Sequence, residues 1–372
     1  MMKKIIHIIL GKANPNRMNG VNKVVYQLAS AQVGIGEIVE VWGITKTPND
    51  PSNYSKKYRL RLFQKQRNPF RLDPLLVKLI EYQDENTIFH FHGGFLPEMY
   101  AISQLLVKLK KAYLFTPHGS CNLVALQKNY FFKKVYFYLF ERRLIQDAKY
   151  VHLIGRSELE AMEKIAPYSR RVLIPNGQDL EQLEKLQYTS EINFGFMGRF
   201  TIHTKGLDLL LKGFKLYREK HQGTGKLQLV GSGGEITKLK KLVDKMELNE
   251  FVFFPGAMFG YEKKKFIRKL TAFFHPSRNE GLPGAVLEAS ALGVPCVVSR
   301  ETNLSEYINE YRAGFGLSDN SPVQIAYAMK KLEGRKNAGS LHYLGNNARK
   351  MIAEEFDWEF IARRFSNELL LH

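Results

Sequence analysis

Residues 271–289 read TAFFHPSRNEGLPGAVLEA, an apolar run that passes through a turn containing glycine and proline into helix-type sequence. A strand that leads through a turn into a helix leaves unsatisfied backbone N–H groups at the helix start, where the helix dipole favours anions. Glu280 and Glu288 flank the turn, and carboxylates accept hydrogen bonds from pairs of sugar or ribose hydroxyls. The segment therefore offers donors for phosphate and acceptors for hydroxyls, and a sugar nucleotide needs both.

The same alternation of strand-like and helix-like runs extends along the whole chain, in two series. Such alternation predicts parallel sheets covered by helices on both faces. We therefore expect an α/β fold with two doubly wound, Rossmann-like domains, residues 1–175 and 191–355, whose sheets face each other across a cleft. The predicted strands are 5–10, 38–44, 87–91, 112–116 and 150–154, then 192–197, 227–230, 252–254, 272–275 and 295–298. The predicted helices are 21–31, 74–82, 97–110, 129–147 and 156–165, then 207–221, 236–246, 261–270 and 284–292. Residues 45–68 read as a long irregular excursion.

Bulk properties exclude several classes of protein. The 372 residues suit two domains of ordinary size. No run reaches the roughly 20 apolar residues that cross a bilayer, and residues 1–10 read as a buried first strand rather than a signal peptide. The two cysteines, Cys121 and Cys296, lie far apart, which favours reduced cytoplasmic thiols. The net charge of +19 favours an anionic partner: a nucleic acid, an acidic membrane surface or a phosphorylated substrate.

Two cations open the second series. Arg199 stands just past a strand and Lys205 just before a helix, so both are expected to meet a pyrophosphate, one as a planar fork and the other as a point charge. There they would also stabilise a departing nucleoside diphosphate. The alternative is a pair of solvated surface cations. Glu280 and Glu288 could instead be ordinary acidic residues at a helix start, favoured by the helix dipole. That alternative does not explain why Pro283 and Gly284 lie in the turn between them.

Three further strand ends carry candidate residues. Gly231 lies in LVGSGGE (229–235), which we interpret as a tight turn lining a nucleotide cleft, because Ile236 occupies the place of the third glycine of a dinucleotide fingerprint. Gly20 precedes a helix and could bring backbone N–H groups to a phosphate. His118 follows a strand and is expected to project into the cleft, with a purely structural role as the alternative.

Two other patterns favour plain interpretations. His90, His92 and His118 could ligate zinc, but no carboxylate or cysteine pattern accompanies them and no Asp-x-Asp pair is present, so we expect no metal. Residues 128–143 mix aromatic and basic side chains. We interpret them as a core helix with a cationic outer edge, against a membrane-surface helix or a nucleic-acid platform.

Taken together, these segments resemble the retaining glycosyltransferases of family 4, which have the two-domain GT-B fold. Glu280 and Glu288, with seven residues between them, are the most specific feature. The terminal run Phe356-Asp357-Trp358 is similar to the segment that crosses back to the first domain in such enzymes, which assigns residues 356–372 to that domain. The other motifs that carry the resemblance are Asn19-Gly20-Val21, His118-Gly119-Ser120, Pro175-Asn176-Gly177, Gly198-Arg199, Lys205-Gly206 and Val230-Gly231-Ser232-Gly233.

The resemblance implies a role for each matching residue. Arg199 and Lys205 would hold the donor diphosphate. Glu288 would bind the ribose and Glu280 the sugar hydroxyls, while His118 would form a hydrogen bond to the transferred sugar. The implied catalytic residues are Glu280, His118, Arg199 and Lys205, and the implied donor-binding residues also include Gly20, Gly231, Gly281, Leu282, Pro283, Gly284 and Glu288. The family implies front-face attack, in which the leaving phosphate takes the acceptor's proton, and no metal or other cofactor. The sequence departs from the family pattern in two places. The loop from Arg199 to Lys205 is one residue longer than the commonest form, and Asn19-Gly20 stands where the family usually has a pair of glycines.

The expected activity is hexosyl transfer from a nucleotide sugar, with UDP favoured over GDP, to a glycan or polyprenyl-linked acceptor. The place would be the cytoplasmic face of the cell membrane, in cell-envelope polysaccharide synthesis, with peripheral contact to anionic lipid. A sugar-nucleotide epimerase or a glycan phosphorylase on a similar scaffold is the alternative enzyme. A basic nucleic-acid-binding protein is the non-enzyme alternative, and we expect no nucleic-acid partner.

Overall fold

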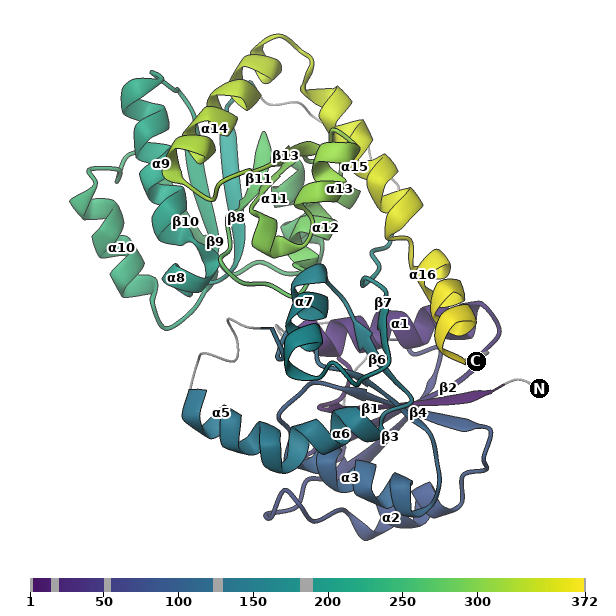
Figure 1. Cartoon of the computed structure of the whole chain (residues 1–372). Coiled ribbons are helices and arrows are strands. Elements are labelled where there is room, and N and C mark those ends of the chain that lie inside the picture. The colour runs from purple at the N-terminus through teal and green to yellow at the C-terminus, as the bar shows by residue number, and fades with distance from the viewer. Residues whose placement is uncertain (1–2, 15–19, 50–54, 123–129, 181–189, 371–372) are drawn as a thin grey trace. The chain divides into compact units, whose positions relative to one another are not determined.

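The computed structural model describes residues 3–14, 20–49, 55–122, 130–180 and 190–370 (Figure 1). The chain divides into two compact units. Unit 1 consists of Met1–Gly177 with Trp358–His372, and unit 2 consists of Gln178–Asp357. Of the polar segment 182–190, which the sequence places between the domains, only Ser190 lies within the described residues.

Unit 1 is built on a seven-stranded, wholly parallel sheet. Its strand order is β3-β2-β1-β4-β5-β6-β7. The first strand, β1, lies inside the sheet, so the chain winds outward in both directions from it, as the predicted doubly wound topology requires. The strands are β1 (Lys4–Leu10), β2 (Ile38–Thr45), β3 (Arg59–Gln64), β4 (Thr87–His92), β5 (Tyr113–Thr116), β6 (Tyr150–Leu153) and β7 (Arg171–Leu173).

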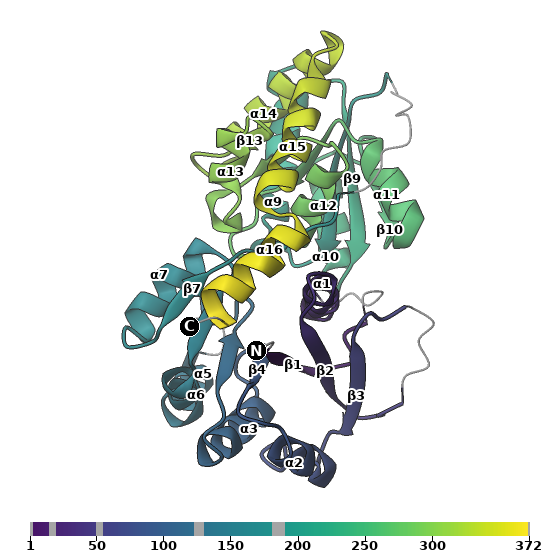
Figure 2. The same ribbon diagram turned by 90° about the vertical axis from the view of Figure 1, so that its right-hand side faces the viewer.

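Helices cover both faces of this sheet, because successive strand residues point to opposite sides. Ile6 and Ile8 of β1 pack under α2, α3 and α6, whereas Ile5 and Ile9 pack under α1 and α16. Figure 2 shows α2 and α3 on one side of the sheet and α1 and α16 on the other. The helices are α1 (Gly20–Gly34), α2 (Pro74–Glu81), α3 (Pro97–Lys108), α5 (Tyr130–Tyr136), the π-helical turn η1 (Phe137–Glu141), α6 (Arg142–Asp147), α7 (Arg156–Ile165), α16 (Trp358–Phe365) and the π-helical turn η3 (Ser366–Leu370).

Unit 2 repeats the design with a six-stranded parallel sheet. The strand order is β10-β9-β8-β11-β12-β13, again with the first strand, β8, inside the sheet. The carboxyl ends of β8, β9, β11 and β12 therefore meet along one edge, where ligands bind in open parallel sheets. The strands are β8 (Asn193–Arg199), β9 (Lys226–Ser232), β10 (Val252–Gly256), β11 (Ala272–His275), β12 (Cys296–Val298) and β13 (Gly314–Gly316).

Two apolar layers hold the helices of unit 2 to its sheet. Phe194 and Phe196 of β8 pack under α9, α10 and α14, while Met197 packs on the side of α11, α12 and α13. Figure 1 shows α9 and α14 on one face and α12 and α13 on the other. The helices are α8 (Ile202–Lys205), α9 (Leu207–Lys220), α10 (Ile236–Lys245), α11 (Gly260–Arg268), α12 (Gly284–Ala291), the 3₁₀ turn η2 (Arg300–Thr302), α13 (Ser305–Glu310), α14 (Pro322–Asn337) and α15 (Leu341–Glu355).

The structure corrects three expectations. Residues 45–68 are not irregular throughout, because β3 pairs with β2 inside that range. The basic composition of this edge strand hid it from the sequence pattern. The short strands β7 and β13 were missed because three residues carry too little periodicity. Within 128–143, the core-helix interpretation is wrong for the outer face: Phe131 is 71% exposed and Phe132 is 78% exposed.

Two further expectations can be compared with the described residues. Both cysteines are free, as predicted, and both are buried. Among the helices of the described residues, none combines the length and the apolar character that crossing a membrane demands.

Candidate active site

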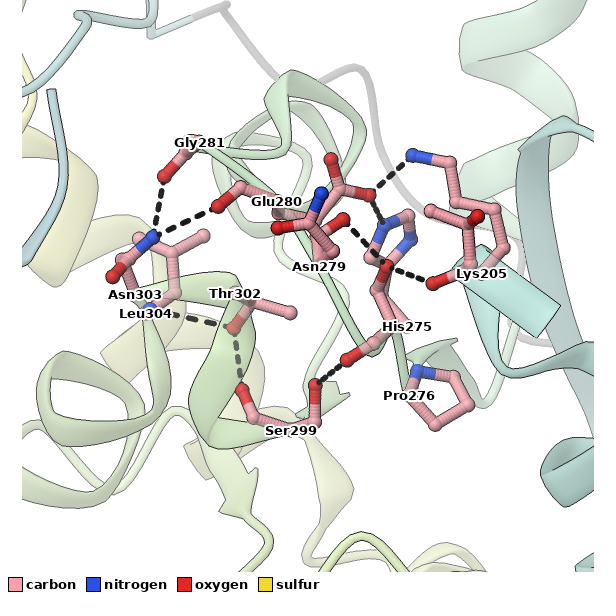
Figure 3. Close-up of polar contacts among 12 residues, drawn as sticks. Lys205, His275, Pro276, Asn279, Glu280, Gly281, Ser299, Thr302, Asn303 and Leu304 are labelled. Atoms are coloured by element: carbon pink, nitrogen blue, oxygen red, sulfur yellow. Dashed lines mark hydrogen bonds and ion pairs between the residues drawn. The ribbon is translucent and has the colours of Figure 1, made fainter. Parts of the chain in front are cut away.

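A half-buried carboxylate between two nitrogen donors forms the centre of the candidate site in unit 2. The loop after β11 carries Glu280, and its Oε1 accepts a hydrogen bond from Nζ of Lys205 and lies 2.7 Å from Nε2 of His275 (Figure 3). His275 is the last residue of β11, and Lys205 ends the short helix α8. The predicted pair of Glu280 and Lys205 is therefore brought into direct contact, although 75 positions separate the two residues.

Electrostatics keep this carboxylate ionised. Burial alone would raise the pKa of Glu280, but the hydrogen bond from His275 and the positive charge of Lys205 outweigh burial and hold the pKa at about 2. Burial lowers the pKa of His275 more than Glu280 raises it. At neutral pH the site thus contains a carboxylate, an ammonium and a neutral imidazole whose Nε2–H donates.

The loop is held in place by contacts to α8, α9 and the segment after β12. The side chain of Arg278 forms a bidentate pair with Asp208 at 2.7 and 2.8 Å, and its backbone N–H donates to the carbonyl of Thr204 at 2.8 Å. Asn303 donates from Nδ2 to the carbonyl of Gly281 at 2.6 Å and to that of Glu280 at 3.2 Å (Figure 3). These contacts fix where the carboxylate points.

Gly206 brings Lys205 against the loop. Its φ is +65°, and a Cβ added there would lie 1.9 Å from the carbonyl oxygen of Pro276. Only glycine fits both the left-handed conformation and this approach. The close contact between the α8–α9 junction and the loop after β11 therefore depends on one residue without a side chain.

Glu288, the second predicted acid, lies on the first turns of α12. It is buried and its Oε2 accepts from Nζ of Lys263 on α11. Gly284 is the first residue of α12 and is exposed, so the backbone at the helix start is accessible from solvent. Glu288 therefore has a cationic partner that the sequence did not indicate.

Arg199 and Gly231 lie at the same sheet edge. Arg199 ends β8, is exposed, and pairs in register with Ser232 of β9. Gly231 has a φ of +145°, and a Cβ there would lie 1.9 Å from the carbonyl oxygen of Gly198. Arg199 and Gly231 thus lie at the carboxyl ends of two neighbouring strands, which is where the phosphate-binding role was predicted.

Unit 1 carries the two remaining predicted residues. Gly20 begins α1 and is exposed; Asn19 lies outside the described residues. His118 follows β5 with a φ of 52°, and its Nε2 lies 2.9 Å from Nδ1 of His92. Burial lowers the pKa of His118 to about 3, so it is a neutral hydrogen-bonding group at neutral pH.

The candidate metal cluster differs from the one weighed on sequence. Among the described residues, the histidines whose nitrogens gather within 4.8 Å are His7, His90 and His92, and His118 is not among them. No carboxylate belongs to this group, and Nδ1 of His7 and Nε2 of His92 lie 2.9 Å apart, a hydrogen-bond distance. The absence of a metal requirement stays a prediction.

Sequence reasoning missed several partners at this site. His275 carried a usable signal, because it ends a strand five residues before Glu280. Lys263 and Asn303 carried none, since lysines and asparagines on exposed helices and turns are common in this chain. The pair of Arg278 and Asp208 was equally hidden.

Comparisons with known proteins point to glycosyltransferases. Two family models match the chain: Glycosyl transferases group 1 over residues 178–351, and Glycosyltransferase Family 4 over residues 18–182. An uncharacterized glycosyltransferase of Methanocaldococcus jannaschii is 27% identical over 263 residues, 67% of this chain and 66% of the relative. The O-antigen biosynthesis glycosyltransferase WclY of Escherichia coli is 27% identical over 235 residues, 56% of this chain and 63% of the relative. The chain thus spans less than two thirds of the length of either relative.

The solved structures extend the likeness over the whole fold. HepE from Anabaena, in complex with UDP and glucose, matches with a TM-score of 0.73 at 15% identity, over 99% of each chain. Two parallel-sheet units of this kind define the GT-B class of glycosyltransferase folds, which confirms the predicted fold class. The two family models match in succession along the chain, and together with the fold they support a GT-B glycosyltransferase that is similar to the group 1 and family 4 enzymes.

Proposed function

We propose that this chain transfers a hexosyl group from a UDP-sugar to a glycan or polyprenyl-linked acceptor in cell-envelope polysaccharide synthesis, with retention of anomeric configuration. The observation that carries the proposal is Glu280, a half-buried and ionised carboxylate held between Lys205 and His275 at the carboxyl edge of the sheet. A carboxylate with accepting lone pairs suits sugar hydroxyls. The ammonium beside it suits a phosphate.

The cations suit the leaving group. Negative charge grows on the nucleoside diphosphate as the glycosidic bond breaks, and preorganised cations stabilise that charge most in a site partly shielded from water. Lys205 is half-buried and already positioned by Glu280, while Arg199 ends the neighbouring strand β8. In this proposal both cations take the place of a divalent metal, so transfer proceeds in the presence of a chelator.

Other predicted residues would supply the remaining donor contacts. Glu288 would accept from the ribose hydroxyls, and the backbone of Gly281, Leu282, Pro283 and Gly284 would approach sugar and phosphate. His118 would form a hydrogen bond to the transferred sugar, and Gly20 of unit 1 would approach the phosphates. Retention follows if the leaving phosphate oxygen takes the acceptor's proton on the face where the acceptor attacks. The UDP preference is supported by HepE, whose solved structure is a complex with UDP and glucose, and the envelope context by the O-antigen relative.

The test is transfer by purified protein from a panel of UDP- and GDP-sugars, with and without EDTA. Glu280→Ala and Arg199→Ala should each lower turnover by about 10²-fold or more. Lys241→Ala is the matched control, since it removes an exposed cation from α10, which carries none of the predicted site residues. Circular dichroism checks that the variants fold. Turnover like that of the wild type in either site variant contradicts the proposal, and so does an inverted anomeric product by NMR.

The alternative functions give different outcomes in the same assay. An epimerase converts the donor sugar without acceptor, and a phosphorylase releases a sugar phosphate from a glycan when inorganic phosphate is added. A nucleic-acid-binding protein binds oligonucleotides with a steep salt dependence and has no affinity for nucleotide sugars.

An exposed aromatic and basic surface on unit 1 supports peripheral contact with an anionic membrane on the cytoplasmic side. We define the α5–η1 surface as its exposed apolar residues, which are Phe131, Phe132, Val135, Tyr138 and Leu139. A cavity of about 400 Å³ adjoins it, lined in part by Lys133, Lys134, Arg142 and Lys164. Rings that enter the headgroup region beside several cations are typical of interfacial helices. A polyprenyl-linked acceptor would be presented at such a surface.

A further inference from the structure

A row of imidazoles runs through the interior of unit 1 and ends at His118. His7 of β1, His92 of β4 and His118 after β5 come from three neighbouring strands, and Gln32 of α1 closes the row at its inner end. Nε2 of His7 lies 2.7 Å from Oε1 of Gln32, and Nδ1 of His7 lies 2.9 Å from Nε2 of His92. Nδ1 of His92 in turn lies 2.9 Å from Nε2 of His118. Four side chains are thus joined by three consecutive hydrogen bonds.

Burial keeps these rings neutral. His7 and Gln32 have no exposed surface and His92 is 2% exposed. Burial lowers the pKa of His7 to about 4 and holds that of His92 well below its ordinary value. A neutral imidazole has one donor and one acceptor nitrogen. Each ring in the row therefore donates to one neighbour and accepts from the other, so all the hydrogen bonds in the row point the same way.

The direction is set at Gln32. Its Oε1 can only accept, so Nε2 of His7 carries the hydrogen and Nδ1 of His7 is an acceptor. Nε2–H of His92 then donates to His7, and Nε2–H of His118 donates to His92. Nδ1 of His118 is left with a free lone pair, and among the described residues none bonds to it. Turning the amide of Gln32 would reverse every bond and place a hydrogen on Nδ1 of His118.

We propose that Gln32, acting through His7 and His92, fixes the tautomer of His118 so that its Nδ1 accepts a hydrogen bond from a hydroxyl of the transferred sugar. This inference deepens the proposed function and rests on it for the identity of the ligand. Gln32, His7 and His92 are positioning residues, because none of them needs to touch the sugar. A fixed acceptor selects a sugar hydroxyl that donates at that position, so the row also contributes to donor-sugar specificity.

A second row in the same sheet provides a matched control. Nε2 of His90 lies 2.6 Å from Oγ1 of Thr116, which lies 2.8 Å from Nδ1 of His152, and Nε2 of His152 donates to the carbonyl of Ile174 at 2.8 Å. This row ends on backbone and has no bond to His118. Thr116→Val cuts it with almost no change in side-chain shape.

A metal bound by His7, His90 and His92 is the competing interpretation of the cluster. It would need the lone pairs of both His7 and His92 on one ion, whereas these rings share a hydrogen bond at 2.9 Å. The proposal therefore predicts that added Zn²⁺ leaves the histidine resonances of the row unchanged.

The experiment is ¹⁵N NMR of histidine-labelled full-length protein near neutral pH, which distinguishes protonated from bare ring nitrogens. The wild type should show His7, His92 and His118 as single Nε2–H tautomers. Gln32→Leu should leave His118 in mixed or reversed tautomers and lower kcat/KM by about fivefold, the effect of one lost neutral hydrogen bond. Gln32→Glu keeps an accepting oxygen and should restore the wild-type tautomer, and Thr116→Val should not change it.

Either Nδ1–H or a charged ring at His118 in the wild type overturns the proposal, as does stoichiometric Zn²⁺ binding by the row. An unchanged tautomer in Gln32→Leu also overturns it. If that variant does not fold, the wild-type tautomers decide alone. Because the resonances do not depend on turnover, a protein with the expected tautomers but no transfer would contradict the proposed function and leave the row intact.

Discussion

The imidazole of His275 donates from Nε2 to Oε1 of Glu280 across 2.7 Å, and this same oxygen accepts from Lys205. One carboxylate oxygen therefore serves two donors of different kinds, one neutral and one charged. His275 also stacks on Phe196, with ring centroids 5.4 Å apart and planes 16° apart, which fixes the plane of the imidazole. The packing of His275 against the core of the sheet thus orients the carboxylate of Glu280.

Replacing His275 should change the pH dependence of transfer. His275→Phe keeps the stacking on Phe196 but removes one hydrogen bond to the ionised form of Glu280, so the pKa of Glu280 rises from about 2. A bond to a charged group is worth roughly 1.5 kcal/mol, or about one pKa unit. The acid limb of kcat/KM should move to higher pH by about that amount. His275→Gln retains an N–H donor and should lie between the two; an identical acid limb in all three proteins would contradict this role.

Gly206→Ala should destabilise unit 2 and impair transfer. A Cβ at this left-handed position would meet the carbonyl of Pro276 at 1.9 Å, and relieving that overlap moves Lys205 away from Glu280. We expect the free energy of unfolding to fall by about 2 kcal/mol or more. Gly234→Ala is the control, because a Cβ there meets no atom within 4 Å, and it should change stability by less than about 0.5 kcal/mol. Urea unfolding measures both, and equal effects of the two substitutions would refute the argument.

The histidines of unit 1 should make the fold acid-sensitive. In the unfolded chain their pKa is about 6.5, whereas burial lowers it in the fold. Between pH 6.5 and about 4 the unfolded state therefore binds protons that the folded state does not, and the free energy of unfolding falls as the pH falls. The pKa is lowered to about 4 for His7 and His152, to about 3 for His118, and well below 6.5 for His90 and His92.

Two buried acids act in the opposite sense. Burial raises the pKa of Glu141 and Glu158 to about 7, so between about pH 4.5 and 7 they favour the folded state as the pH falls. They are outnumbered by the five histidines, so stability should decrease from pH 7 to 5, by about 1.4 kcal/mol per pH unit for each net proton. Urea unfolding at pH 5.5, 6.5 and 7.5 measures the slope. His152→Gln should reduce it by about one proton, and a slope of the opposite sign would show that the acids dominate.

Membrane contact should depend on the α5–η1 surface. Replacing both Phe131 and Phe132 by serine removes two exposed rings, at 71% and 78% exposure, and should abolish most co-sedimentation with anionic vesicles while leaving the fold unchanged. Tyr343→Ser is the control, because this ring is 62% exposed but lies on α15 of unit 2. Equal binding by all three proteins, or equal binding to neutral and anionic vesicles, would exclude this surface as the membrane contact.

Local patterns predicted most of the architecture. Apolar runs such as residues 5–10 and 272–275 are short, continuous and bounded by turns, so they identify buried parallel strands, and β1 and β11 occur where expected. The basic, polar edge strand β3 lacks that signal. Exposed edge strands tolerate polar residues on both faces, so their sequences read as loops.

The candidate site was only partly accessible from the sequence. Glu280, Glu288, Arg199 and Lys205 could be found because strand ends and turns are visible in a linear pattern, and the carboxyl ends of parallel strands share one edge. Their partners could not be found. Lys263 lies on a helix with several other lysines, and only the crossover that places α11 beside α12 brings it to Glu288.

The order of residues therefore determined the alternation of strands and helices, the positions of the turns, and which side chains stand at strand ends, because these properties depend on neighbours a few positions away. The tertiary structure decided that Lys205 and His275 share one oxygen of Glu280 and that Gln32, His7, His92 and His118 form one hydrogen-bonded row. Such contacts join residues up to 85 positions apart. They arise from strand order and helix packing, which place side chains together without leaving any local periodicity in the chain.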